Sequence, residues 1–366
     1  MSKHLLNPLV LYVFLIFTPF IAAMVFYSIP YYSRHMLILL ISFVAFLAGY
    51  TVANFLQLRE VVSLDRVPFR MSLLYSSSFI ANILLSVYFL YMLNFNFPFF
   101  DHHLRPDLYK NAGFLWGLYI LSGLIFSGVS ALMLMVRGSN KAIYLTLLTI
   151  LLVVALSFGM KNVLLYFFLT FFVTYLMISK LFLNLSFFKL VYFLVPFIYV
   201  LVLVNVARSG VDYSFTYVFY ILFNYIFPSF SNLFNLISDG SCCFYSPGLS
   251  LVYPVADFLL GVNCAQFLPA NLLDQPAFNV FTGFAPLLII GGKIEVLIFF
   301  LFFGFFSNVF YRHSSNQGSF VSSFVYAQFV ICFVMFHNSM YFQSLSPVLS
   351  IFMVAIFYKF RIRYHG

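Results

Sequence analysis

Residues 8 to 29 read PLVLYVFLIFTPFIAAMVFYSI and contain no charged side chain. A helix of about 20 apolar residues is long enough to cross the hydrocarbon core of a bilayer. The run lacks a small-residue cleavage site, and another run follows soon after, so we expect a retained span and not a signal peptide. The whole chain shares this composition, because 64% of its 366 residues are hydrophobic and 7% are charged. A water-soluble domain has about 25% charged residues, so a soluble globule is excluded.

Apolar runs of similar length recur along the chain. In hydrocarbon the backbone must satisfy its own hydrogen bonds, so each run is expected to be a helix. The runs are continuous and do not alternate, which excludes an outer-membrane barrel. We expect an all-α, polytopic integral membrane protein that forms one membrane domain over residues 1–366. The ten expected spans are 8–29, 36–57, 71–96, 113–136, 142–157, 163–178, 190–207, 294–311, 320–336 and 348–360.

Basic residues predict the orientation, because cytoplasmic segments of membrane proteins are enriched in lysine and arginine. With a cytoplasmic N-terminus, 12 of the 18 basic residues fall in inside segments. We therefore expect both termini in the cytoplasm. The net charge of +9 then indicates topology and contact with anionic lipid, and not nucleic-acid binding. The six basic residues expected outside are Arg34, Arg105, Lys110, Lys161, Arg208 and Lys293.

One long outer loop is expected over residues 208–293. Its portion 217–237 is apolar enough to span, but amides, serines and Pro228 interrupt it. A crossing there would put the basic C-terminal tail outside, so we expect an interfacial or re-entrant helix. The loop also holds Cys242, Cys243 and Cys264. A bridge from Cys264 to one of the adjacent pair and three unpaired thiols are both open.

Outer basic residues are the first candidates for chemistry, since most of the 9 acidic residues lie in loops. A cationic pocket would suit a lipid-linked phosphate or diphosphate. Arg208 adjoins a glycine and Asp212, which favours function over simple snorkelling. For Lys161, phosphate binding and simple snorkelling are equally open. For Lys293 we expect simple snorkelling, partly because Glu295 can pair with it.

A proton acceptor could come from the ninth expected span. His337 lies at its outer end beside Asn338, and an imidazole there could take a proton from a sugar hydroxyl. Asp212 is the second candidate for this base. No cysteine and histidine spacing resembles a zinc site, and we expect no metal.

Several short motifs resemble those of the oligosaccharide repeat-unit polymerases, the O-antigen polymerase (Wzy-type) family. The aromatic-rich spans with one long outer loop in the second half are similar to the layout of that family over about the whole chain. The Ile289-Ile-Gly-Gly-Lys-Ile-Glu295 segment departs from it, because it lacks the aspartate and the second glycine of the family's late element. The motifs that carry the resemblance are Gly159-Met-Lys161-Asn, Asn205-Val-Ala-Arg208-Ser-Gly210, Asn224-Tyr225-Ile-Phe-Pro228, Asn279-Val-Phe-Thr282-Gly and His337-Asn338.

The resemblance implies glycosyl transfer on the periplasmic face of a bacterial inner membrane. A glycan on undecaprenyl diphosphate would be moved as a block onto an incoming lipid-linked repeat unit, with no cofactor. A chain-length regulator protein is a further partner that the resemblance suggests, alongside the lipids of the inner membrane. The implied roles are diphosphate binding for Arg208, Lys161 and Arg105, proton acceptance for His337 or Asp212, and glycan contact or loop ordering for Asn224, Tyr225, Asn279, Thr282 and Asn338.

Three other functions compete with a polymerase. An O-antigen ligase would share the cavity and the arginines. A flippase for lipid-linked oligosaccharide would show pseudo-symmetric halves and a polar path, and neither is visible. A scaffold protein would not need an amide-rich outer loop.

Overall fold

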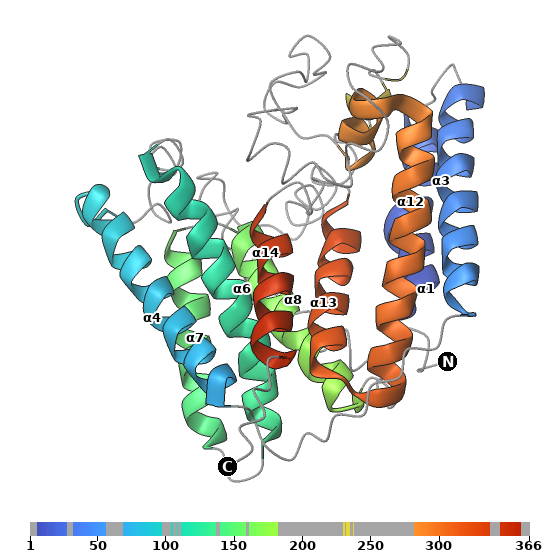
Figure 1. The fold of residues 1–366 in the computed structure, drawn as a ribbon. Coiled ribbons are helices and arrows are strands. Elements are labelled where there is room, and N and C mark those ends of the chain that lie inside the picture. The colour runs from blue at the N-terminus through green and yellow to red at the C-terminus, as the bar shows by residue number, and fades with distance from the viewer. Residues whose placement is uncertain are drawn as a thin grey trace.

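A computed structural model describes residues 6–27, 32–55, 69–96, 104, 108, 111–136, 140–158, 161–181, 230, 232–234, 237, 282–336 and 345–359. Every regular element in these ranges is a helix (Figure 1). All of the expected spans except 190–207, which lies outside the described residues, coincide with helices. The prediction of an all-helical fold is therefore confirmed for the part of the chain that is described.

The helices begin and end close to the predicted boundaries. The first span is one continuous helix made of α1 (Pro8–Tyr12), a π-helical turn η2 (Val13–Phe17) and α2 (Thr18–Phe26). The others are α3 (Tyr32–Ala53), α4 (Phe69–Met92), α6 (Phe114–Met135), α7 (Lys141–Ser157), α8 (Lys161–Ile178), α12 (Phe284–Gln317), α13 (Phe320–Met335) and α14 (Leu345–Lys359).

Five of these helices are long and apolar enough to cross a membrane: Pro8–Phe26, Arg34–Ala53, Arg70–Met92, Phe114–Met135 and Gly291–Asn316. Four shorter apolar helices pack among them, namely Lys141–Ser157, Asn162–Ile178, Phe320–Met335 and Leu345–Tyr358. The chain is thus a helical protein of the membrane type. The count of ten spans stays a prediction.

The helices run between two ends of the bundle (Figure 1). At one end, Arg312 Nη1 donates to the carbonyl of Ala53 at 3.0 Å, and Lys180 Nζ donates to the carbonyl of Asn316 at 3.4 Å. Helices α3, α8 and α12 therefore finish together, and we call this the Arg312 end. We call the opposite end, at which α13 finishes and Thr282 lies, the Thr282 end.

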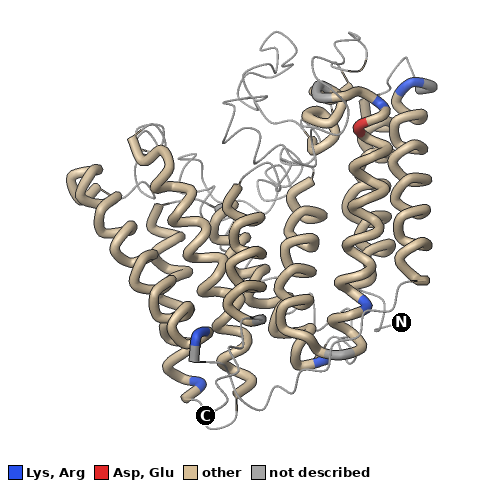
Figure 2. Tube along the Cα trace, in the orientation of Figure 1, with Lys and Arg blue, Asp and Glu red and all other residues tan. Residues whose placement is uncertain are grey.

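Basic residues gather at these two ends, and Figure 2 shows none across the middle of the described helices. Arg70 and Lys141, both expected inside, begin α4 and α7 at the Arg312 end. Arg34 and Lys293, both expected outside, lie in α3 and α12 near the Thr282 end. This separation agrees with the predicted sorting of charges, and the side of the membrane that each end faces stays a prediction.

Neighbouring helices along the chain alternate in direction, with one exception. Helices α8 and α12 both run from the Thr282 end to the Arg312 end (Figure 1). The chain therefore leaves α8 at one end of the bundle and enters α12 at the other. The predicted span 190–207 would supply that return.

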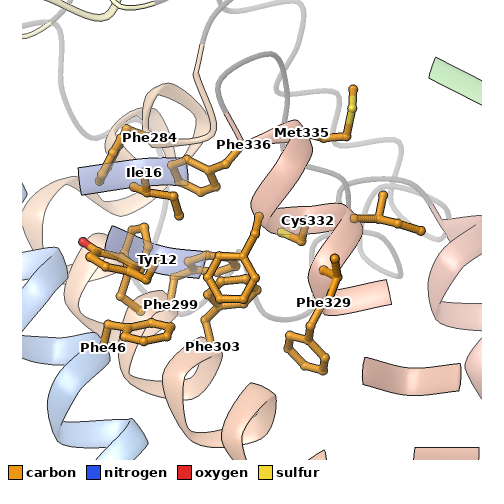
Figure 3. Close-up of a cluster of buried hydrophobic side chains, with 14 of the residues drawn as sticks. Tyr12, Ile16, Phe46, Phe284, Phe299, Phe303, Phe329, Cys332, Met335 and Phe336 are labelled. Atoms are coloured by element: carbon orange, nitrogen blue, oxygen red, sulfur yellow. The ribbon is translucent and has the colours of Figure 1, made fainter. Parts of the chain in front are cut away.

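Aromatic side chains fill the interior in two buried clusters. The first joins the N-terminal helix, α3, α12 and most of α13, and Figure 3 shows its rings, including Phe46, Phe303 and Phe336. The second joins α4, α6, α7 and α14. Helices α8 and α13 contribute to both clusters and so hold the two parts of the bundle together.

A proline explains the π-helical turn in the first helix. Pro19 has no N–H to donate, and its ring crowds the carbonyl one turn earlier. The chain widens just before it, and the N–H of Thr18 bonds to the carbonyl of Val13, five residues back. Tyr12 precedes the wide turn, and its hydroxyl and that of Ser42 in α3 are 2.7 Å apart.

Helices α3 and α12 pack backbone against backbone. A Cβ atom placed on Gly304 would lie 2.2 Å from the carbonyl oxygen of Phe46, and one on Gly49 would lie 1.9 Å from that of Leu301. Both positions therefore need glycine. Below the crossing, Asn308 Nδ2 donates to the carbonyl of Tyr50 at 2.7 Å, which ties the two helices together.

Part of the predicted interfacial or re-entrant segment is described. Residues 230, 232–234 and 237 are helical and buried. The ring of Phe20 meets those of Phe230 and Phe234 edge-on at 5.6 and 5.4 Å, so these residues pack near the Thr282 end. Cys242, Cys243 and Cys264 lie outside the described residues, and Cys332 is buried in α13.

Candidate functional site at the Thr282 end

A backbone hydrogen bond joins the start of α12 to the end of α13. The N–H of Gly283 donates to the carbonyl of Phe336 at 2.6 Å. The rings of Phe284 and Phe336 meet edge-on, with centroids 5.0 Å apart (Figure 3). Two segments more than fifty residues apart in the sequence are therefore held together at the Thr282 end. Gly283 ends the Asn279–Gly283 motif, and Phe336 directly precedes the His337-Asn338 motif.

Thr282 is the one predicted glycan or loop-ordering residue whose side chain is described. It is wholly buried, and its hydroxyl has no hydrogen-bond partner among the described residues. Its carbonyl accepts the N–H of Ala285 at 3.0 Å, so the backbone of Thr282 orders the start of α12. A buried hydroxyl without a partner costs free energy, on the order of 1–3 kcal/mol.

Lys161 begins α8 at the same end of the bundle. Helices α8 and α13 are antiparallel neighbours, and Gln328 Nε2 donates to Thr170 Oγ1 at 3.3 Å between them. From this bond, Lys161 lies nine residues along α8 and Phe336 lies eight along α13, or about 13 and 12 Å at 1.5 Å per residue. The backbones of Lys161 and Phe336 therefore lie at about the same level on adjacent helices.

The remaining predicted site residues lie outside the described ranges. His337 and Asn338 follow Phe336 directly along the chain. The other six are Arg105, Arg208, Asp212, Asn224, Tyr225 and Asn279. The structure thus holds the chain at Thr282 and Gly283 against Phe336 and places Lys161 at about the same level on the neighbouring helix, and the roles predicted for all of these residues stay predictions.

A break in α12 separates its first turns from the membrane helix. Gly291 has φ −145° and ψ 17°, and Gly292 has φ 64° and ψ −146°. The second pair of angles is one that glycine alone adopts readily. The portion 284–290 turns away from the long helix as a result, as the bend at the top of α12 in Figure 1 shows. This bend carries Thr282 and Gly283 over to the end of α13.

Glu295 also lies at this end of the bundle. Its one expected role from the sequence was as a charge partner of Lys293. It is wholly buried, whereas Lys293 is exposed. Residues two apart on a helix point to different sides, which explains the difference. The signal that could have found Glu295 is its position, because it is the one acidic residue within an expected span.

His35 is a second buried polar residue at this end. It is wholly buried in the first turn of α3. Its Nε2 lies 3.4 Å from the carbonyl oxygen of Phe234, and the two rings meet edge-on at 5.1 Å. His35 therefore anchors the described part of the 217–237 segment to α3.

Within the described ranges, no group of three histidine, cysteine, aspartate or glutamate side chains could hold a metal ion. Comparison with protein-family models, with curated proteins and with solved structures finds no match to this chain.

Proposed function

We propose that this membrane protein is a glycosyltransferase that polymerises undecaprenyl-diphosphate-linked oligosaccharide repeat units. The Thr282 end would face the periplasm of a bacterial inner membrane. The resemblance of its short motifs to the O-antigen polymerases motivates the proposal, together with its helical membrane fold.

The observation that carries the proposal is the hydrogen bond from the N–H of Gly283 to the carbonyl of Phe336. It joins the chain after the Asn279–Thr282 motif to the chain before His337 and Asn338. Lys161 begins its helix at the same level. A site of this kind needs glycan contacts, a proton acceptor and a cation close together, and these segments carry one candidate for each.

The reaction requires a proton acceptor for the attacking hydroxyl and cations that stabilise the leaving diphosphate. The bond between the anomeric carbon of the growing glycan and its diphosphate oxygen breaks, and a bond from that carbon to the acceptor hydroxyl oxygen forms. The hydroxyl proton passes to a base, for which His337 is preferred and Asp212 is second. Undecaprenyl diphosphate leaves with the electron pair, and fixed cations from Arg208, Lys161 and Arg105 stabilise its charge.

The test is polymer formation by purified protein in lipid nanodiscs supplied with a lipid-linked repeat unit. We expect a ladder of products on a gel from the wild-type protein. Arg208→Ala and Lys161→Ala should abolish the ladder, and Arg208→Lys should weaken it if the contact is bidentate. Lys293→Ala is the matched control, because this exposed lysine lies at the same end outside the proposed site. Normal ladders from both alanine variants would contradict the diphosphate role.

A deletion strain separates polymerase from the alternatives. Loss of a polymerase leaves one repeat unit on the surface lipid in place of a ladder. Loss of all surface repeats would instead indicate a ligase or a flippase, and would refute the proposal.

A further inference from the structure

A line of polar side chains runs along the buried side of α4. Ser78, Asn82 and Ser86 follow one another at intervals of four residues, so they share one face of the helix. All three are buried, and Asn82 bonds across this face to α6. Polar groups inside an apolar helix bundle are costly unless they are hydrogen-bonded. Each polar atom of this face is therefore expected to have a partner.

The amide of Asn82 is paired at only one of its two ends. Its Nδ2 donates to the carbonyl of Tyr119 at 3.0 Å and to the hydroxyl of Ser122 at 3.2 Å, both on α6. A carbonyl only accepts, so the amide has to turn Nδ2 and not Oδ1 toward Tyr119. The Oδ1 atom is then buried with no hydrogen-bond partner among the described residues. Asn82 thus presents a bare acceptor inside the bundle.

The hydroxyl of Tyr119 is a second buried polar atom at this interface. The residue is wholly buried, and its hydroxyl has no hydrogen-bond partner in the described part of the chain. Four rings enclose the phenol with centroids 5.1 to 5.9 Å from its own, those of Phe89, Trp116, Phe158 and Phe167. This packing fixes the direction of the ring, so the hydroxyl cannot turn to another partner.

The two unpaired groups lie about one helical turn apart. The Tyr119 hydroxyl lies toward Ser86 without reaching hydrogen-bonding geometry. Ser86 is four residues from Asn82 on the same face of α4, or about 6 Å. It donates its own proton to the carbonyl of Asn82 at 2.7 Å, so its oxygen can only accept a further bond. A hydrogen bond between oxygens is about 2.8 Å long, so one water molecule spans a separation of this size.

We propose that the interface of α4 and α6 binds an ordered water molecule, held by Asn82 Oδ1 and the hydroxyls of Tyr119 and Ser86. The water donates to Asn82 Oδ1 and to Ser86 Oγ, and it accepts the proton of the Tyr119 hydroxyl. Three partners are the typical number for a buried water in a protein. The site does not depend on the proposed function. It makes the contact of α4 with α6 a hydrated one, whereas α3 and α12 meet backbone to backbone.

The experiment is X-ray radiolytic labelling of the purified protein in detergent, read by mass spectrometry. Radicals formed from a bound water oxidise the side chain beside it, whereas radicals from bulk water reach exposed side chains. Tyr12 is the matched control, because it is also wholly buried and its hydroxyl lies 2.7 Å from that of Ser42. We expect Tyr119 to be oxidised about fivefold faster than Tyr12 or more, as a side chain in contact with internal water. Equal rates for the two tyrosines overturn the inference.

Variants show which residues hold the water. Asn82→Leu and Ser86→Ala each remove one partner and should bring the oxidation of Tyr119 down toward the rate of Tyr12. Ser78→Ala is the control on the same face of α4, since its hydroxyl donates to the carbonyl of Tyr75 at 3.0 Å, and it should leave the labelling unchanged. Wild-type oxidation of Tyr119 in both Asn82→Leu and Ser86→Ala overturns the inference.

Two further measurements keep the outcomes separate. The melting temperature of each variant shows whether it folds, and Ser86→Ala removes few atoms if Asn82→Leu does not fold. Water labelled with oxygen-18 and added just before exposure should enter the Tyr119 product more slowly than the products of exposed side chains. Equally fast entry indicates an open path from bulk solvent, and overturns the assignment of a bound water.

Discussion

Substitution of Gly304 by alanine tests the backbone-to-backbone packing of α3 against α12. The new Cβ would lie 2.2 Å from the carbonyl oxygen of Phe46, and such contacts are not found below 3.0 Å. Helices α3 and α12 would have to separate by about 0.8 Å at this point, the difference between the two distances. Side-chain bonds between the two helices would lengthen with them.

The magnitude follows from the bonds that bridge α3 and α12. Asn308 Nδ2 to Asn54 Oδ1 and Arg312 Nη1 to the carbonyl of Ala53 are both 3.0 Å long. A separation of this size carries both past hydrogen-bonding range, at about 0.6 kcal/mol each within a membrane. Overpacking adds about 1–3 kcal/mol. We expect Gly304→Ala to lose about 2–4 kcal/mol of stability in total.

The assay is thermal denaturation of the purified protein in detergent, followed by the loss of its monodisperse peak in size-exclusion chromatography. Gly304→Ala should lower the midpoint by several degrees. Gly117→Ala is the matched control, since the nearest atom to its new Cβ is Ser346 Oγ at 3.5 Å, an ordinary contact. Equal midpoints for Gly304→Ala and the wild type would refute the close crossing of α3 and α12.

Three further substitutions are measured by the same denaturation assay. Asn82→Ala removes bonds to the carbonyl of Tyr119 at 3.0 Å and to Ser122 Oγ at 3.2 Å, and should cost about 1–2 kcal/mol; an unchanged midpoint would contradict these bonds. Gly292→Ala forces a side chain into φ 64° and ψ −146° and should cost about 1–3 kcal/mol, whereas a stable variant would show that the break in α12 can be rebuilt. Thr282→Val should leave the midpoint unchanged or higher, because the hydroxyl has no hydrogen-bond partner in the described part of the chain, and should reduce polymer formation; full activity would exclude a substrate contact.

Hydropathy was a good predictor of the helices but a poor predictor of where α12 ends. The expected span stops at residue 311, and the helix continues to Gln317. A polar segment need not end a helix when its side chains find partners. His313 Nδ1 and Ser322 Oγ are within hydrogen-bond distance, and the hydroxyls of Ser314 and Ser323 lie 2.6 Å apart. These partners lie on α13 and are not evident from the local sequence.

The start of α12 shows a second limit of the sequence. The two adjacent glycines, Gly291 and Gly292, pointed to a motif before the span, and not to a helix that continues through them. The turns before the break are stabilised by tertiary contact, because Phe284 packs on Phe300 and Phe336. Such long-range packing decides local structure that propensity leaves open.

The candidate site was predicted in part. The sequence pointed to Lys161, Thr282 and the segment after Phe336, and the structure places Lys161, Thr282 and Phe336 at one end of the bundle. The sequence could not show that the backbones of Gly283 and Phe336 are hydrogen-bonded, because strand-like or helical periodicity carries no information on which helix ends meet. The burial of Glu295 was not predicted, because its sequence neighbour Lys293 suggested a simple ion pair between the two.

The directions of the helices have a practical consequence for measuring orientation. The first helix begins at Pro8 and the last ends at Lys359, both at the Arg312 end (Figure 1). A label attached to either terminus therefore reports on the same compartment. One protease-protection or impermeant-dye measurement at either tail assigns every described helix end to its side of the membrane, and with it the compartment that the Thr282 end faces.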